Sequence, residues 1–291
     1  MNGSELHHVR CNLCGQDDPE LLILGDPSPV VRCQRCGLIY RNPRMSVTTE
    51  VIQYEEAVYS EEFIANWSKL RRFDEQLEKI EQYAQRGKLL DIGCQFGAFL
   101  RMATDAGWET QGVDPSLQTC EIGKKLGLRI FRGTLKEANF DSGSYDVATM
   151  LLVLDQIPDP KAELFEVKRV LKKKGFLFIR VPNVACHLLA HRLVEVLGKL
   201  SLSRTDPSVF HIYGFSADTL RRLLLVTGYR VHQIKNSKPS KADPYRTSSP
   251  IRGAGVELGK ICVHALAQLL YYTSFGKLHM GSSIEAVAQI P

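Results

Sequence analysis

The fold is decided by the stretch LLDIGCQFG, which occupies residues 89–97 of this 291-residue chain. Its apolar start predicts a buried strand that ends in the carboxylate of Asp91. Gly93 and Gly97 then predict a tight turn before a helix that starts near Ala98. Because glycine has no Cβ, such a turn lets the backbone approach a ligand closely. This order is typical of the first strand, turn and helix of an open α/β sheet.

A second predicted strand, GVDP at residues 112–115, also ends in a carboxylate, that of Asp114. A carboxylate at this place can accept hydrogen bonds from two ribose hydroxyls, so the expected ligand contains a nucleoside. A dinucleotide fingerprint would read G-x-G-x-x-G, and here Gln95 stands at its middle glycine. The pattern therefore does not favour a dinucleotide, and a turn of an unrelated α/β fold is the plain alternative.

The turn reads D-x-G-x-x-x-G, which resembles motif I of the class I S-adenosylmethionine-dependent methyltransferases. The resemblance continues in YDVATMLLVLDQIPDP (145–160) and HIYGFSADTL (211–220), and it covers about residues 86–236 and the last strand. It implies an α/β fold with a doubly wound, Rossmann-like seven-stranded sheet. We expect a helix that ends at Leu171, a turn at 172–175, strand five at 176–181, and the last two strands at 228–234 and 282–290.

The resemblance also implies where S-adenosylmethionine would bind, across the carboxyl edge of strands one, two and four. The methionine half would lie on the turn, the ribose on Asp114, the adenine beside the residues after strand three, and the residues that end strand four would cap the other side. The expected cofactor-binding residues are Asp91, Gly93, Cys94, Gln95, Gly97, Asp114, Pro115, Thr134, Leu135, Met150 and Leu151.

The acceptor side is less well defined, because the family often has Glu-His after strand four and this chain has Asp155-Gln156. A base is needed only if the acceptor carries a proton. His211 lies in a loop at the carboxyl edge, and an imidazole there can accept a proton near neutral pH. We therefore expect His211, with Tyr213 nearby, to be catalytic, and the alternative is that His211 only ties its loop down.

The front of the chain carries two C-x-x-C-G units, with cysteines at Cys11, Cys14, Cys33 and Cys36. This spacing is typical of a four-thiolate zinc ribbon, in which the closed coordination sphere makes the metal structural. Two disulfides are the alternative. The first ten residues are polar and resemble no signal peptide, so a cytoplasmic, reducing location is expected and disulfides are not favoured.

These motifs divide the chain into a zinc ribbon (1–43), a helical linker or cap (44–86) and a methyltransferase domain (87–291). Within the last, 184–213 is expected to be a substrate or lid insertion, with an amphipathic helix at 184–200. A second insertion is expected at 237–282, with an apolar helix at 256–275 that is too polar for a confident membrane span. In the linker, Tyr54, Tyr59 and Trp67 either belong to a helix packed on the sheet or help to line the cofactor entrance.

The charge balance helps to choose among acceptors. The formal net charge is +5, and a basic balance this weak does not favour nucleic acid. The resemblance favours methyl transfer to a hydroxyl or amine of a small metabolite of sugar, cell-surface or natural-product type. The alternatives are methylation of RNA and a non-catalytic protein that binds the cofactor or serves as a scaffold. The sequence leaves the oligomeric state open.

Overall fold

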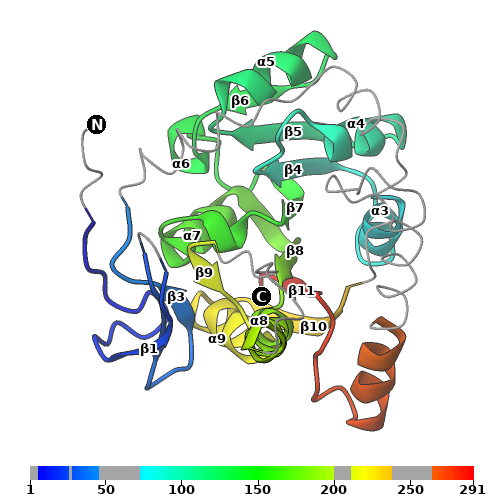
Figure 1. Cartoon of the computed structure of the whole chain (residues 1–291). Coiled ribbons are helices and arrows are strands. Elements are labelled where there is room, and N and C mark those ends of the chain that lie inside the picture. Colours follow the sequence, from blue (N-terminus) through cyan, green and yellow to red (C-terminus); the bar gives the residue numbers. More distant parts are fainter. Residues whose placement is uncertain (1–5, 26–27, 46–72, 200–210, 238–263) are drawn as a thin grey trace, which may run out of the picture.

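The computed structural model describes residues 6–25, 28–45, 73–199, 211–237 and 264–291, which form two sheets with flanking helices (Figure 1). The larger sheet has seven strands in the order β10-β11-β8-β7-β4-β5-β6. The smaller has four, in the order β1-β2-β3-β9. Tyr54, Tyr59 and Trp67 of the predicted entrance lie outside the described residues.

The seven-stranded sheet confirms the predicted α/β fold. Its parallel strands are β4 (Lys88–Ile92), β5 (Glu109–Asp114), β6 (Ile130–Arg132), β7 (Tyr145–Leu151) and β8 (Leu171–Pro182). The edge is formed by β10 (Arg230–Asn236) and β11 (Ser283–Gln289), and β11 runs antiparallel to both of its neighbours. The strands predicted at 228–234 and 282–290 are therefore present within two residues of their expected limits.

Helices cover both faces of this sheet because its central strands are apolar on both sides. Adjacent Leu89 and Leu90 are fully buried in separate clusters, since successive side chains of a strand point to opposite faces. The cluster that contains Leu89 also contains residues of α3 (Asp74–Glu81), α4 (Ala98–Asp105) and α5 (Leu117–Lys125). The cluster that contains Leu90 also contains residues of α6 (Leu135–Ala138), α7 (Pro160–Val170) and α9 (Ala217–Val226).

Capping residues set where several of these helices start. The hydroxyl oxygen of Ser216 accepts a hydrogen bond from the backbone N–H of Thr219 and begins α9, as the sequence predicts. Asp159 caps α7 in the same way, with Pro160 at the first helical position. The amphipathic helix is present as α8 (Val184–Lys199), and the described part of the predicted apolar helix is helical over 264–273.

One local prediction is wrong. The turn expected at residues 172–175 lies inside β8, which starts at Leu171 directly after α7 ends at Val170. The ladder between β7 and β8 shifts register here, and Lys174 has a positive φ of 61°. The segment is therefore a bulged start of the strand, held by the ion pair between Lys172 Nζ and Asp146 Oδ1 at 2.8 Å.

The four-stranded sheet joins the front of the chain to a segment far along it. Its first three strands are β1 (Pro19–Ile23), β2 (Val30–Cys33) and β3 (Ile39–Arg41). The fourth is β9 (Tyr213–Gly214), which pairs antiparallel with β3 so that Tyr40 lies opposite Tyr213. The end of the predicted lid insertion thus completes the N-terminal sheet and holds it against the larger domain.

Candidate functional site

The turn between β4 and α4 is built as its glycines require. Gly93 and Gly97 have φ of +70° and +84°, a region in which other residues are strained. The backbone N–H groups of Gly93 and Cys94 both donate to the carbonyl of Val113, at 2.8 and 3.2 Å. A Cβ at Gly93 would clash with Cγ2 of Val153, so the residues after β7 lie directly over the turn.

Asp114, at the end of β5, holds this turn through its side chain. One carboxylate oxygen accepts from the backbone N–H of Gln95 at 2.8 Å. The other accepts from the N–H of Ser116 at 3.0 Å and the hydroxyl of Thr119 at 3.1 Å. Burial raises the pKa of Asp114, and these hydrogen bonds oppose that rise. A carboxylate has about four lone-pair sites, so it can still accept from a ligand hydroxyl.

Asp91, at the end of β4, is buried below the same turn. Its carboxylate accepts a hydrogen bond of 2.6 Å from the hydroxyl of Thr149, on the neighbouring strand β7. Burial raises the pKa of Asp91 to about 7, and the nearby Asp114 adds to the rise. The turn is therefore framed by two buried carboxylates. The sequence did not indicate the contact between Thr149 and Asp91, because only the pairing of β4 with β7 brings them together.

The other predicted cofactor residues divide between the turn, its surroundings and the core. Cys94 is buried and Gln95 half-buried on the turn, and Pro115 is exposed after β5. Thr134 caps α6 and forms a capping box with Glu137. Leu135 and Met150 are fully buried, so a nucleoside would reach their side chains only after local repacking.

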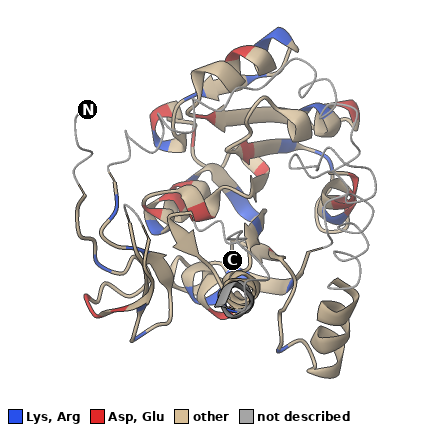
Figure 2. Cartoon of the chain, in the orientation of Figure 1, with Lys and Arg blue, Asp and Glu red and all other residues tan. Residues whose placement is uncertain are grey.

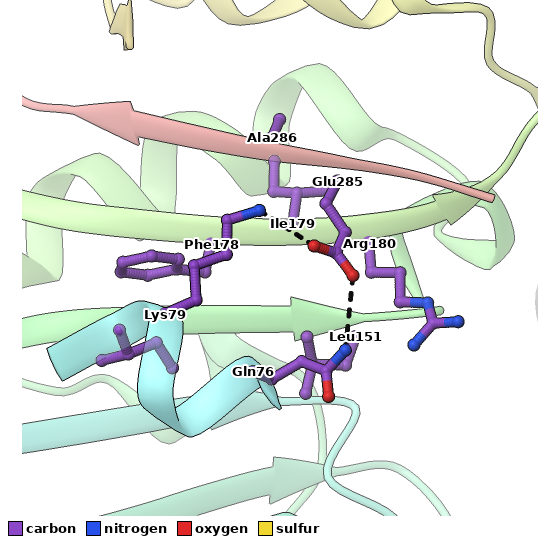
Figure 3. Close-up of a pocket in the computed structure, with 9 residues that line it drawn as sticks. Gln76, Lys79, Leu151, Phe178, Ile179, Arg180, Glu285 and Ala286 are labelled. Atoms are coloured by element: carbon purple, nitrogen blue, oxygen red, sulfur yellow. Dashed lines mark hydrogen bonds and ion pairs between the residues drawn. The ribbon is translucent and has the colours of Figure 1, made fainter. Parts of the chain in front are cut away.

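Leu151 instead borders a small cavity between α3 and the sheet (Figure 3). Glu285 of β11 accepts there from Lys79 Nζ at 2.9 Å and from Gln76 Nε2 at 3.3 Å. Arg180 of β8, only 8% exposed, also lines it. Among the described residues, its volume of about 20 Å³ is enough for roughly one water molecule.

His211 lies near the end of β7, as the resemblance implies. Its Nε2 is 4.0 Å from Oδ2 of Asp155, in the 3₁₀ turn η1 (Leu154–Gln156) that follows β7. Burial lowers the pKa of His211, and Arg41 and His187 lower it further. The imidazole is therefore neutral at pH 7 and able to accept a proton.

Tyr213 is held differently from His211. It is 4% exposed, and its hydroxyl donates to the carbonyl of Pro158 at 3.0 Å and accepts from Arg44 Nη1 at 3.1 Å. Arg44 also donates to the Pro158 carbonyl, at 3.0 Å. These contacts tie the N-terminal segment to the loop after β7, and they favour a positioning role for Tyr213 over proton transfer.

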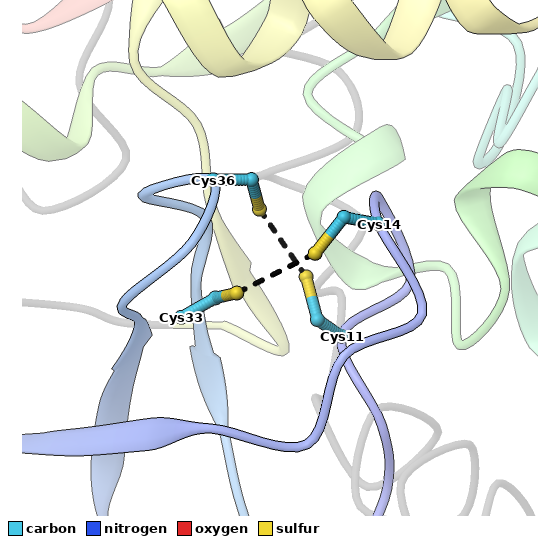
Figure 4. Close-up of side chains that lie close together, drawn as sticks. All are labelled: Cys11, Cys14, Cys33 and Cys36. Carbon is cyan, nitrogen blue, oxygen red and sulfur yellow. Dashed lines mark hydrogen bonds between the residues drawn. The ribbon is translucent and has the colours of Figure 1, made fainter.

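The four N-terminal cysteines come together as predicted (Figure 4). Their sulfur atoms all lie within 4.8 Å of one another, with Cys11 and Cys36 at 3.4 Å and Cys14 and Cys33 at 3.5 Å. A disulfide requires about 2.05 Å, whereas thiolates about 2.3 Å from one tetrahedral ion are separated by nearly 4 Å. The donor set and its spacing therefore fit Zn²⁺.

Contacts outside the cysteine cluster fix it to the larger domain. Arg222 of α9 donates to the carbonyl of Cys36 at 3.3 Å. The Asn12 side chain donates to Asp159 at the start of α7, at 2.8 Å. Arg41 Nε donates to the carbonyl of His211 at 3.3 Å. No local sequence pattern indicates these partners, because each contact joins segments more than 140 residues apart.

Comparisons with known proteins agree with this architecture. Residues 65–234 match a family described as a methyltransferase domain. Over 135 residues the chain is 28% identical to a ubiquinone biosynthesis O-methyltransferase of Haemophilus ducreyi, covering 43% of this chain and 56% of that one. Over 131 residues it is 30% identical to the protein of the same name from Methylococcus capsulatus, covering 43% and 54%. The chain thus spans about half the length of these curated relatives.

Solved structures show the same fold. An S-adenosylmethionine-dependent methyltransferase of Mesorhizobium loti superposes with a TM-score of 0.51 at 15% identity, over 75% of this chain and 97% of that one. A SAM-dependent methyltransferase of Methanosarcina mazei gives 0.50 at 17% identity, over 73% and 96%. Within the described part of the chain, a search for helices with the length and apolarity of a membrane span found none.

Proposed function

The chain belongs to the methyltransferase domain family, and from this premise we propose that it transfers the methyl group of S-adenosylmethionine to a hydroxyl or amine of a small metabolite. The observation that carries the proposal is the glycine turn between Asp91 and Asp114, with His211 beside the end of β7. These groups lie at the carboxyl ends of neighbouring parallel strands, where open α/β sheets bind their ligands.

The residues of the turn suit this cofactor, which supplies a methyl group on a sulfonium with a good leaving group. Gly93 and Gly97 provide backbone without side chains on the methionine side. Asp114 would accept from the ribose hydroxyls while it holds Gln95 and Ser116 in place. In-line displacement depends on alignment and the exclusion of water, which a pre-organised turn provides.

On the acceptor side, neutral His211 would take the proton of a hydroxyl as its oxygen attacks the methyl carbon. The curated relatives are named O-methyltransferases, which supports a hydroxyl acceptor. Basic and acidic residues are mixed along the helices in Figure 2, which supports a small molecule over RNA. We further propose that the acceptor is a metabolite of sugar, cell-surface or natural-product type and that the protein is cytoplasmic.

We assign a structural Zn²⁺ to the four cysteines. Four thiolates would complete its coordination and leave no open position for water. Burial raises the pKa of Cys33 and Cys36, and a bound cation would oppose that rise by stabilising their thiolates. We also propose that the chain divides into units at 1–43, 44–86 and 87–291. The pairing of β9 with β3 connects the last unit to the first.

Calorimetry with S-adenosylmethionine and with S-adenosylhomocysteine tests the cofactor assignment. We expect micromolar affinity for both, followed by transfer of a labelled methyl group to a panel of phenols, sugars, amines and RNA. Absence of binding in folded, zinc-loaded protein would overturn the proposal. Binding without transfer to any acceptor would instead support a non-catalytic protein, and transfer to RNA alone would replace the small-molecule acceptor.

Replacing Asp114 with alanine should weaken S-adenosylmethionine binding by about 1–3 kcal/mol, the cost of an unpaired polar contact. The variant also frees the backbone N–H of Gln95 and so loosens the turn. Calorimetry measures the loss, and Asp105→Ala is the control because Asp105 is exposed on α4, where its carboxylate pairs with Arg101. Equal affinity of Asp114→Ala and the unaltered protein for S-adenosylmethionine would show that Asp114 does not bind the cofactor.

A further inference from the structure

Asp155 is a buried carboxylate in the short turn that follows β7. It is 2% exposed, and within the described chain its Oδ1 has no hydrogen-bond partner. Burying a polar group without a partner costs free energy, so such a group calls for an explanation in function. Burial raises the pKa of Asp155 to about 7, so near neutral pH the group gains or loses a proton easily.

The neighbour of Asp155 is His211. The 4.0 Å from Oδ2 to Nε2 is within ion-pair range and longer than a hydrogen bond. Catalytic hydrogen bonds are often this long before the substrate is bound. The His211 backbone is fixed from the other side, because its carbonyl accepts from Arg41 Nε and the next carbonyl, that of Ile212, accepts from the Arg41 N–H at 3.0 Å.

The ionisable groups around the imidazole have opposite effects on its protonation. In the described elements packed around it, the ionisable groups that act on His211 are Asp155 from η1, Arg41 from β3 and His187 from the first turn of α8. Arg41 and a protonated His187 disfavour an imidazolium, whereas an ionised Asp155 favours it. Asp155 is therefore the one group of the three that would stabilise His211 after it has taken a proton.

We propose that Asp155 is the positioning residue of His211: its carboxylate accepts a hydrogen bond from Nε2–H, which leaves Nδ1 unprotonated to take the proton of the acceptor. In the step, the acceptor oxygen forms a bond to the methyl carbon as the bond from that carbon to sulfur breaks. The sulfur keeps the electron pair, the hydroxyl proton moves to Nδ1, and Asp155 pairs with the imidazolium. This inference rests on the proposed function, since it assumes that His211 serves a methyl acceptor.

The test uses Asp155→Asn in the full-length, zinc-loaded protein, followed by NMR of the histidine side chains with S-adenosylhomocysteine present. The His211 signals are assigned by their loss in His211→Gln. Removing the anion should lower the proton affinity of His211 about tenfold. It should also reduce kcat about 10- to 100-fold, with the KM for S-adenosylmethionine unchanged. The acidic limb of the activity profile should move to lower pH, which a merely structural role would not cause.

Two further variants sharpen the result. Gln156→Ala is the matched control, because it removes a hydrogen bond from Gln156 Nε2 to the Leu152 carbonyl on the same short turn. It should leave the His211 titration and kcat within twofold of the unaltered protein. Asp155→Glu keeps a carboxylate and should restore part of the rate. An Asp155→Asn protein with unchanged His211 titration and unchanged kcat would overturn the proposal.

A measurement on the unaltered protein keeps the inference testable even if Asp155→Asn does not fold. The ¹⁵N shifts of His211 report which ring nitrogen carries the proton, and we expect it on Nε2. A proton on Nδ1 would overturn the inference. Because this readout needs no turnover, a wrong tautomer in a protein that transfers methyl groups contradicts only the role of Asp155. Lack of cofactor binding contradicts the proposed function.

Discussion

Replacing Cys33 with serine is expected to remove bound zinc and lower the melting temperature by about 10 °C or more. Cys33 is fully buried, and its sulfur lies among the three others of the cluster. The N-terminal sheet is too small to bury much core, so the metal would supply much of its folding free energy. Metal analysis and a thermal melt measure the two effects.

The loss of stability should extend beyond the cysteine cluster, because β3 pairs with β9 and Arg41 holds the backbone of His211. We therefore expect methyl transfer to fall together with zinc content, while the Asp91–Gly97 turn still binds S-adenosylmethionine. Cys186→Ser is the matched control, since Cys186 is a half-buried single thiol on α8. Stoichiometric zinc and an unchanged melting temperature in Cys33→Ser would contradict the assignment.

Replacing His211 with glutamine is expected to reduce kcat by about 10²- to 10⁴-fold, the usual contribution of a general base. Cofactor affinity should change less than twofold, because Asp91 and Asp114 hold the turn without His211. Labelled-methyl assays and calorimetry separate the two quantities. His232→Gln is the control, since this exposed histidine contacts Gln289 at the sheet edge.

The pH dependence has a definite sign. A general base accepts a proton only when it is neutral, so if His211 has this role kcat/KM should fall as the pH drops through its pKa. Burial, Arg41 and His187 place that pKa below the ordinary value of 6.5 in the unliganded protein. Activity should therefore persist at pH 6.5 and be lost only at lower pH, as the pH falls through the pKa of His211. A profile without an acidic limb, or a His211→Gln enzyme with normal kcat, would leave His211 only its alternative role of tying the loop down.

The features predicted correctly from the sequence are those set by neighbouring residues. The glycine turn follows from backbone freedom at Gly93 and Gly97, and the start of α9 follows from the capping hydroxyl of Ser216. The cysteine cluster follows from two short spacings that each place a pair of sulfurs on one knuckle. The lysine run at 172–174 and the following glycine favour a turn, but the same residues fit a bulge at the start of β8, where Lys174 has a positive φ.

The sequence by itself determined the α/β sheet, the glycine turn between Asp91 and Gly97 and the four-cysteine cluster, because short-range periodicity, glycine conformation and cysteine spacing specify them. Only the tertiary structure decided that β9 completes the N-terminal sheet, that Thr149 holds Asp91, and that Asp155 lies beside His211. These contacts join residues 56 to 175 positions apart. They arise from strand pairing and from the packing of loops at one sheet edge, which no local pattern records.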